Sequence, residues 1–542
     1  MKLAVKERPI LALLLVLVGV VVALGRSPLP DVAWPLYLAR EILGGARLTV
    51  DFQEVNPPLF VWMSLPAALL GRLTGASPWK VNAILLGMTM GLSVLLSDRF
   101  LRLGSHAKIR FWLVLLIGFV LAIFPLSEFG EREHIALVLT VPYVLLAAAR
   151  GESASSGKGT LFLAGVLAGV GIALKPYFLP AWFLVEMCLV GRRGWRVLGR
   201  TEAIAVVVVG TSYLASVVVL EPGYFRLAVT WADLYGRYLR QYFVYFAMFP
   251  NVWGVLPVFA ALVLLAASLQ GKRLPLHEVL LAASLGFWCA AVLQGKGLSY
   301  HHLPGAGYAV LLVGAVAMQP GRSGFSRPSD LILVLARAVS LAVPLIAGLA
   351  LGLDLAVRRV PGDRDRDASR LLEIVRREAA GRRILVLSTN PASGWPLTLE
   401  AGARWGSRFM SQWQLAALYH DELWTVGGVV RPRPYSERRG VERIFHDAMI
   451  ADLQRYKPQL ILVLQVDSTV GGFGGATRID YLSYFGSDLR FRAIIAGYDS
   501  MATVGRYRVL RRREDLTYSE VQGSGLPSAR RLLPRVSGTS SP

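Results

Sequence analysis

The chain of 542 residues is 54% hydrophobic and only 17% charged, and its mean hydropathy is +0.49. Soluble proteins carry nearer a quarter charged residues, so this composition excludes an ordinary soluble protein and indicates one that crosses a membrane many times. The net charge of +22 lies largely in short basic clusters between apolar segments. Such clusters favour topology signals and contact with anionic lipid over nucleic-acid binding.

The N-terminal sequence MKLAVKERPI precedes an apolar run that ends near Leu24, and this pattern also fits a cleaved signal peptide. Because many apolar segments follow, we expect an uncleaved first helix. Both cysteines, Cys188 and Cys289, fall inside apolar segments, so we do not expect a disulfide framework.

The apolar segments predict the fold class, because a bilayer core takes about 20 apolar residues per helix. We predict an α-helical polytopic membrane protein with about eleven spans. They lie near 9–25, 80–97, 111–126, 134–149, 160–175, 177–190, 202–220, 247–268, 276–293, 304–319 and 330–354. The piece 58–70 is short and begins at Pro58, so we expect an interfacial helix there.

The charges of the connecting loops predict an orientation. Short loops rich in Lys and Arg lie at 98–110, 150–159, 191–200, 270–278 and 319–330, and we expect them in the cytoplasm. The five alternating loops hold most of the acidic residues, the histidines and the aromatics, and we expect them outside. In chain order they are 26–79, 127–133, a tight turn at Lys175-Pro176, 221–246 and 294–304. We therefore expect a multi-pass inner (plasma) membrane protein, with its N-terminus cytoplasmic and its C-terminal domain periplasmic or extracellular.

The composition changes near residue 360, which predicts a membrane domain over 1–358 and an outer α/β domain over 359–515. In the outer domain we predict a helix at 369–381, buried strands at 382–389 and 458–466, and a basic edge strand at 506–513. The tail 516–542 has the composition of a disordered segment. GGFGG at 471–475 lacks the Lys and the following helix of a phosphate-binding loop.

The loops expected outside carry a set of residues able to perform group transfer, because ionisable groups at a membrane edge are costly and tend to mark function. A carboxylate base, with cations near an anionic leaving group, is the minimum for moving a sugar from a lipid phosphate. The candidates are Asp31, Glu41, Asp51, Glu131, Glu133, His134, Lys175, Arg237, Arg240, Lys296, Tyr300, His301 and His302.

Each candidate also has a purely structural interpretation. Asp31 is able to cap a surface helix that begins near Val32, and Glu131 and Glu133 suit the positive end of a helix dipole. Lys175 is able to extend to lipid headgroups. Adjacent histidines on a helix point in different directions, so we do not expect His301 and His302 to share a metal ion.

Three stretches resemble a known family. The first outer loop, DVAWPLYLAREILGG (31–45) with DFQEVNPPL (51–59), is similar to that of the GT-C glycosyltransferases, in the branch of the protein mannosyltransferases and the lipid A aminoarabinose transferase. FGEREHIALVLTVPYVL (129–145) resembles that family's acidic residue at the mouth of a helix. QGKGLSYHHLPGAGY (294–308) resembles a Lys/Tyr/His loop of bacterial members. The resemblance covers roughly residues 5–355.

The resemblance implies about eleven to thirteen spans and an active site on the outer face. It implies a polyprenyl-phosphate-linked sugar donor, a cell-envelope glycan, lipid or protein as acceptor, and inversion at the sugar. Asp31 matches the catalytic acidic position, and either Glu131 or Glu133 matches a second one. We expect the donor phosphate at Lys175, Arg237, Arg240, Lys296, His301 and His302, and other substrate contacts at Tyr37, Glu41, Asp51, His134 and Tyr300.

Two departures bear on the sugar and on any metal. Asn56 stands where the aminoarabinose transferase has Lys, and the second acidic position holds Glu instead of Asp. The outer loops contain no Asp-x-Asp motif, so we expect no cofactor, with a divalent metal as the alternative. The competing function is a transporter or flippase of lipid-linked sugars. The absence of an internal repeat and the gathering of charges at one membrane edge favour the enzyme.

Overall fold

The structure is a computed structural model, and it describes residues 8–104, 109–151, 157–240, 252–271, 274–319, 328–357, 363–425, 429–467 and 473–513. The chain forms two compact units that divide between residues 362 and 363. Residues 247–251 of one predicted span and the predicted tail 516–542 lie outside the described residues.

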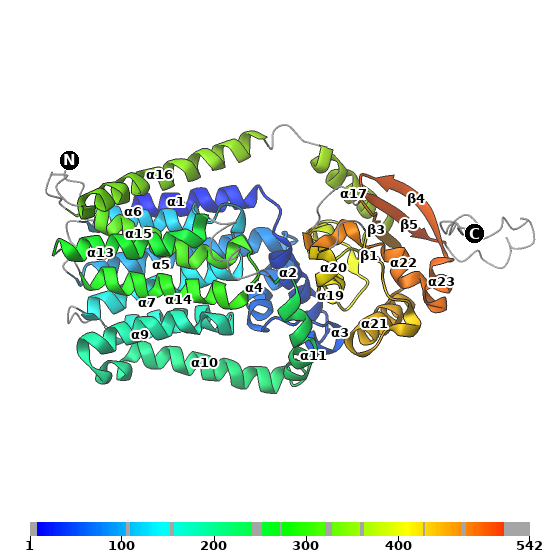
Figure 1. Ribbon diagram of the computed structural model, residues 1–542, viewed down its shortest axis with the longest axis horizontal. Coiled ribbons are helices and arrows are strands. Elements are labelled where there is room, and N and C mark those ends of the chain that lie inside the picture. Colours follow the sequence, from blue (N-terminus) through cyan, green and yellow to red (C-terminus); the bar gives the residue numbers. More distant parts are fainter. Residues whose placement is uncertain are drawn as a thin grey trace, which may run out of the picture. The chain divides into compact units, whose positions relative to one another are not determined.

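The first unit is helical (Figure 1). Its helices are α1 (Arg8–Leu24), α2 (Pro30–Ile42), α3 (Leu48–Asp51), α4 (Leu59–Thr74), α5 (Pro78–Leu101), α6 (Arg110–Ala122), α7 (Arg132–Gly151), α8 (Lys158–Ala173), α9 (Leu179–Arg193), α10 (Thr201–Leu220), α11 (Tyr224–Arg237), α13 (Val252–Leu269), α14 (Pro275–Gln294), α15 (Ser299–Ala317) and α16 (Pro328–Val357). Short 3₁₀ turns form at η1 (Leu126–Glu128), η2 (Pro176–Phe178) and η3 (Trp195–Gly199).

Over the described residues, each predicted span overlaps one helix of this unit, but only some of these helices have the length of a membrane span. Among the described residues, five helices are long and apolar enough to cross a membrane: α5, α7, α10, α14 and α16. Five further apolar helices are shorter: α1, α4, α6, α8 and α13. The spanning stretch of α7 is enclosed on all sides, whereas α10 and α16 expose most of theirs. Exposed Leu and Val on these outer helices are typical of a surface that faces lipid.

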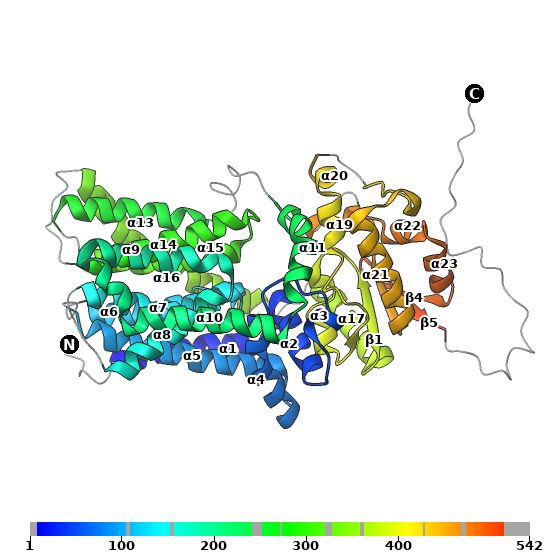
Figure 2. The ribbon, with the colours of Figure 1, turned by 90° about the horizontal axis from the view of Figure 1, so that it is seen from below.

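Three short helices lie beyond one end of the long ones. Both views show α2, α3 and α11 gathered at this end, next to the beginning of α4 (Figure 1, Figure 2). α2 buries Trp34 and Tyr37, whose rings stack at 5.9 Å and pack edge-on against Phe52 from the following loop. This aromatic packing turns the long first loop into a folded layer at the end of the bundle.

The second unit is an α/β domain, as the sequence predicts. Its helices are α17 (Asp363–Ala379), α18 (Leu397–Glu400), α19 (Trp413–Leu418), α20 (His420–Thr425), α21 (Gly440–Tyr456), α22 (Tyr481–Gly486) and α23 (Leu489–Ile495), with turns η4 (Pro391–Ser393), η5 (Tyr435–Glu437) and η6 (Phe473–Arg478). Its strands are β1 (Arg383–Leu387), β2 (Arg404–Trp405), β3 (Leu460–Leu464), β4 (Tyr498–Val504) and β5 (Tyr507–Arg512), in the order β2-β1-β3-β5-β4.

The strand predicted at 506–513 forms as β5, but the prediction that it lies at an edge is wrong. β5 pairs antiparallel with β3 on one side and with β4 on the other. Its arginines find partners on the same unit: Arg511 pairs with Glu378 at 3.4 Å, and Arg512 Nη1 donates to the Lys457 carbonyl at 2.9 Å. β4 takes the edge, and its mixed polar sequence YDSMATV carries only a weak strand pattern.

The bundle depends on small residues where helices approach closely. A Cβ added at Gly286 of α14 would lie 2.3 Å from the Ala181 Cα of α9 and 2.8 Å from the Pro180 carbonyl oxygen. These are backbone atoms of α9, which cannot move aside as the end of a flexible side chain can. Helix pairs in membranes commonly rely on such contacts between small residues.

We predict that Gly286→Ala lowers the thermal midpoint of the detergent-solubilised protein, because overpacking costs about 1–3 kcal/mol. Gly210→Ala in α10 is the matched control, since nothing lies within 4 Å of its added Cβ. Thermal unfolding followed by circular dichroism measures both. Equal midpoints for the two variants would contradict the close α9–α14 contact.

Candidate active site

Asp31 lies in the first turn of α2, where the helix dipole favours a carboxylate. The helix begins at Pro30 and its N-cap residue is Leu29, so the interpretation of Asp31 as a cap is wrong. Instead, the Tyr300 hydroxyl at the beginning of α15 donates to Asp31 Oδ2 at 3.1 Å. The side chain of Asp31 is half-buried, so it is fixed but accessible.

The beginning of α7 buries four successive polar residues, 131–134. Lys175, in the turn after α8, donates from Nζ to Glu133 Oε1 at 2.5 Å and to the Gln294 amide oxygen at 3.1 Å. Both members of the ion pair are buried, at 5% and 0% side-chain exposure. His301 Nε2 lies 3.7 Å from the same oxygen of Glu133. The ends of four helices therefore meet at one ion pair.

Glu131 differs from Glu133 in that no cation of the described residues forms an ion pair with it. Among the described residues, no hydrogen-bond donor reaches its buried Oε2. Burial raises the pKa of Glu131 well above its usual range, and the nearby charges of Asp31 and Glu133 raise it further. Arg132 opposes this shift. The protonated form of Glu131 is therefore favoured relative to that of an exposed carboxyl group.

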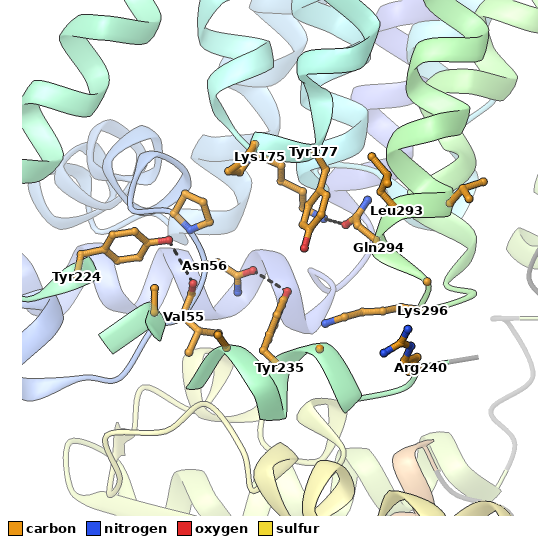
Figure 3. Close-up of a pocket in the computed structure, with 17 residues that line it drawn as sticks. Val55, Asn56, Lys175, Tyr177, Tyr224, Tyr235, Arg240, Leu293, Gln294 and Lys296 are labelled. Atoms are coloured by element: carbon orange, nitrogen blue, oxygen red, sulfur yellow. Dashed lines mark hydrogen bonds between the residues drawn. The ribbon is translucent and has the colours of Figure 1, made fainter. Parts of the chain in front are cut away.

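A cavity of about 550 Å³ opens next to this cluster (Figure 3). Its charged lining residues are Lys175, Arg240 and Lys296, and no carboxylate is among its described lining residues. The remaining lining is Val55, Asn56, Pro57, Pro176, Tyr177, Tyr224, Ala228, Ala232, Tyr235, Gly236, Val292, Leu293, Gln294 and Gly295. The cavity is thus a cationic pocket that also offers tyrosine hydroxyls and amide groups. Such a lining suits an anionic group joined to a polar one.

One wall of the pocket is α11, which is bound to the first loop. Its Tyr224 hydroxyl donates to the Val55 carbonyl at 3.3 Å and its Tyr235 hydroxyl to Asn56 Oδ1 at 3.1 Å (Figure 3). Trp231 Nε1, on the same helix, donates to Gln53 Oε1 at 2.9 Å. Three side chains of α11 therefore bind three residues of the loop, at positions 53, 55 and 56, and fix the wall in place.

Glu54 fixes this part of the loop from the other side. Its carboxylate accepts from Trp34 Nε1 at 2.5 Å, and from the backbone and side-chain nitrogens of Asn56 at 2.7 and 2.6 Å. Burial raises the pKa of Glu54, and these three hydrogen bonds oppose that shift.

Comparisons with known proteins show which solved structures share this architecture. No family model and no curated protein sequence match the chain. Among solved structures, the crystal structure of ArnT from Cupriavidus metallidurans bound to undecaprenyl phosphate matches with a TM-score of 0.54 and 14% identity, over 94% of this chain and 98% of that one. Its apo form matches with a TM-score of 0.52 and 13% identity, over 92% and 97%. ArnT is a GT-C glycosyltransferase. The chain has the GT-C fold.

Several residues predicted from the sequence lie together at the mouth of this GT-C bundle. Asp31, Glu133, Lys175, Tyr300 and His301 share direct contacts or one bonding partner. Arg240 and Lys296 line the adjacent cavity. His302 is buried one position further along α15, beside Gly254 of α13.

Other predicted site residues make contacts outside the pocket. The exposed Arg237 pairs with Asp233 at 3.1 Å, and the Arg47 backbone nitrogen donates to Asp51 Oδ2 at 3.0 Å. The remaining three predicted residues, Tyr37, Glu41 and His134, make packing contacts, a local ion pair or a local hydrogen bond. Tyr37 is fully buried in the aromatic packing of α2, Glu41 pairs with Arg40 at 3.5 Å, and the Gly130 nitrogen donates to His134 Nδ1 at 3.0 Å.

Sequence reasoning missed four residues of the GT-C site. Arg132 is buried between the two predicted acids, with its guanidinium 5.9 Å from the centre of the Phe60 ring. Gln294, Tyr177 and Tyr235 line the cavity. The only signal for Tyr235 is the concentration of aromatic residues in the fourth outer loop. Within the described residues, no group of three or more His, Cys, Asp or Glu is arranged to hold a metal ion.

We predict that Glu133→Gln or Lys175→Met each lowers the thermal midpoint strongly, because removing one partner of a buried pair costs about 3–5 kcal/mol. The double variant leaves no unpaired charge, so it should recover part of the loss. Thermal unfolding in one detergent compares all three. A double variant whose loss equals the sum of the two single losses would show that the pair is not coupled.

Proposed function

We propose that the chain is an integral-membrane glycosyltransferase that moves a sugar from a polyprenyl-phosphate-linked donor to a cell-envelope acceptor on the outer face of the membrane. The observation that carries the proposal is the juxtaposition of two environments. The half-buried carboxylate Asp31, oriented by Tyr300, belongs to the same cluster as Lys175, and Lys175 also lines a cavity whose charged lining is cationic. The GT-C fold supports it, and the ArnT crystal structure holds undecaprenyl phosphate.

The cationic cavity is the proposed donor site. Lys296, Arg240 and Lys175 would surround the donor phosphate, which gains negative charge when its bond to the sugar breaks. Asn56 occupies the position where the aminoarabinose transferase has Lys, and its amide is engaged by Glu54 and Tyr235. The cations of this site therefore come from the turn after α8, the segment after α11 and the turn after α14, and not from the first outer loop.

Asp31 is the proposed general base. Burial and the neighbouring carboxylates favour the protonated form of Glu131, and Glu133 is bonded to Lys175, so we assign the base to neither. Asp31 is accessible, and its bond from Tyr300 fixes one carboxylate oxygen and holds the group in place to accept a proton from a substrate hydroxyl. Glu133 then acts through Lys175, which it orients, and does not itself contact the reacting atoms.

In the proposed reaction, the acceptor hydroxyl oxygen attacks the anomeric carbon of the donor sugar. Its proton passes to Asp31 as the new carbon–oxygen bond forms. The bond from the anomeric carbon to the phosphate oxygen breaks, and the polyprenyl phosphate leaves with the bonding electron pair. A single displacement of this kind inverts the anomeric configuration. The proton on Asp31 is released to water after the product leaves.

We predict that Asp31→Asn lowers the transfer rate by about 10²–10⁴-fold, the usual contribution of a general base. Asp233→Asn is the matched control, because Asp233 is 71% exposed and pairs only locally with Arg237. The measurement is transfer of radiolabelled sugar from total polyprenyl-phosphate donors in membranes, with NMR of the product for its anomeric configuration. Binding of undecaprenyl phosphate should be the same in both variants.

Three outcomes would contradict this proposal. Normal transfer in Asp31→Asn would remove Asp31 as the base. A product that retains the anomeric configuration would exclude the single displacement. Failure of the wild-type protein to transfer any label, with donor lipid crossing a vesicle membrane instead, would favour the transporter.

We predict that Glu131→Gln keeps most of the transfer activity, because the amide has the shape of the protonated carboxyl group that burial favours there. The same assay measures it, and a Glu131→Lys variant serves as the negative control. Loss of activity in a correctly folded Glu131→Gln protein would mean that the reaction needs the ionised form of Glu131.

A further inference from the structure

Lys296 is a buried cation with an unusual partner. Its loop follows α14, and the flanking glycines Gly295 and Gly297 have φ angles of 62° and 59°, a conformation that favours glycine. This turn directs the residue into the bundle, where only 7% of it is exposed. In the described parts of the chain, no carboxylate forms an ion pair with it. Lys175, by contrast, is bonded to Glu133.

Aromatic rings take the place of a carboxylate. Lys296 Nζ lies 3.3 Å from the centre of the Tyr235 ring and 5.3 Å from that of Tyr238. A ring face attracts an ammonium group through its quadrupole, more strongly when water is excluded. It does not neutralise the charge, and it leaves the ammonium hydrogens available to an acceptor on the cavity side.

We propose that Tyr235 is a positioning residue: its ring, with that of Tyr238, holds the Lys296 ammonium at the cavity as an unneutralised cation that receives the donor phosphate. This inference rests on the proposed function, because it takes the ligand of the cavity to be a polyprenyl phosphate. It also explains why Lys296 is buried without an acidic partner. An ion pair at this position would have to break before a phosphate was able to bind.

The ring itself is fixed by the first outer loop. The Tyr235 hydroxyl donates to Asn56 Oδ1 at 3.1 Å, and the Asn56 amide nitrogen donates to Glu54 Oε1 at 2.6 Å. Both side-chain ends of Asn56 are therefore used, and the plane of the Tyr235 ring depends on them. The Lys296 ammonium is thus positioned by Tyr235 of α11, and Tyr235 is positioned by Asn56 of the first outer loop.

The charges around Lys296 give the arrangement a pH dependence. Burial, together with the nearby cations Lys175 and Arg132, lowers the pKa of Lys296 to about 7, while Asp31 opposes the shift. Arg240 lines the same cavity, and the phenols of Tyr235 and Tyr238 face Lys296. A bound phosphate favours the charged ammonium, so it raises this pKa.

The sign of the effect follows from that shift. Below about pH 7 the empty site already holds the proton, so this group adds no pH dependence to phosphate binding. Above about pH 7, binding must take up a proton at Lys296. The affinity for a phosphate should therefore fall as the pH rises through this range, until it passes the pKa of the bound state.

The experiment measures undecaprenyl phosphate binding to the full chain in nanodiscs, between about pH 6 and pH 9. We expect Tyr235→Leu to weaken binding about tenfold, because it removes the ring. Tyr235→Phe keeps the ring and loses only the hydrogen bond to Asn56, so it should stay within about threefold of wild type. In a Lys296→Met background, Tyr235→Leu should have no further effect.

Equal losses in Tyr235→Phe and Tyr235→Leu, or a full loss from Tyr235→Leu in the Lys296→Met background, would overturn the inference. If Tyr235→Leu does not fold, the pH profiles decide. The decline above about pH 7 should be present in wild type and absent in Lys296→Arg, whose charge persists, and identical slopes would overturn the inference. Wild-type protein that binds no undecaprenyl phosphate at any pH would overturn the proposed donor as well.

Discussion

The ion pair between Lys175 and Glu133 is the contact on which the rest of the site depends. A membrane bundle has no water to solvate charges at the ends of its helices, so each buried charge needs a partner. This pair joins the turn after α8 to the beginning of α7, and Gln294 and His301 bring in α14 and α15. Four helix ends are thereby held in register, and the cavity exists because they are.

Lys175 also separates two electrostatic environments. It is paired with Glu133, which lies near Asp31 and Glu131, and it also lines a cavity whose charged lining is cationic. A group-transfer enzyme needs this separation, because a base must attract a proton while the leaving group must find positive charge. A single lysine that contacts both environments keeps them close without letting the carboxylates line the cavity. Lys296, held by rings, extends the cationic side without adding an acid.

The sequence was sufficient to predict the apolar helices and a gathering of charged residues at one end of them, because hydropathy over about 20 residues is a local signal. It did not predict which of those residues meet. Asp31 and Tyr300 are 269 positions apart, and no local pattern pairs them. Arg132 lies between Glu131 and Glu133, the two residues that match the acidic pattern, and Tyr235 is one of several aromatic residues on α11. Strand β5 was assigned to an edge because β4 has too polar a sequence to signal a strand. Its basic residues suited an edge but are paired within the domain.

The cavity is lined by residues from positions 55–57, 175–177, 224–240 and 292–296, and this dispersion has a consequence for synthesis. A growing chain has made more than half of its 542 residues before Lys296 leaves the ribosome. Until α14 and the turn after it are inserted, Lys175 lacks Gln294 and the Tyr235 ring has no ammonium to hold. The helices that precede α14 therefore enter the bilayer before the cavity is complete.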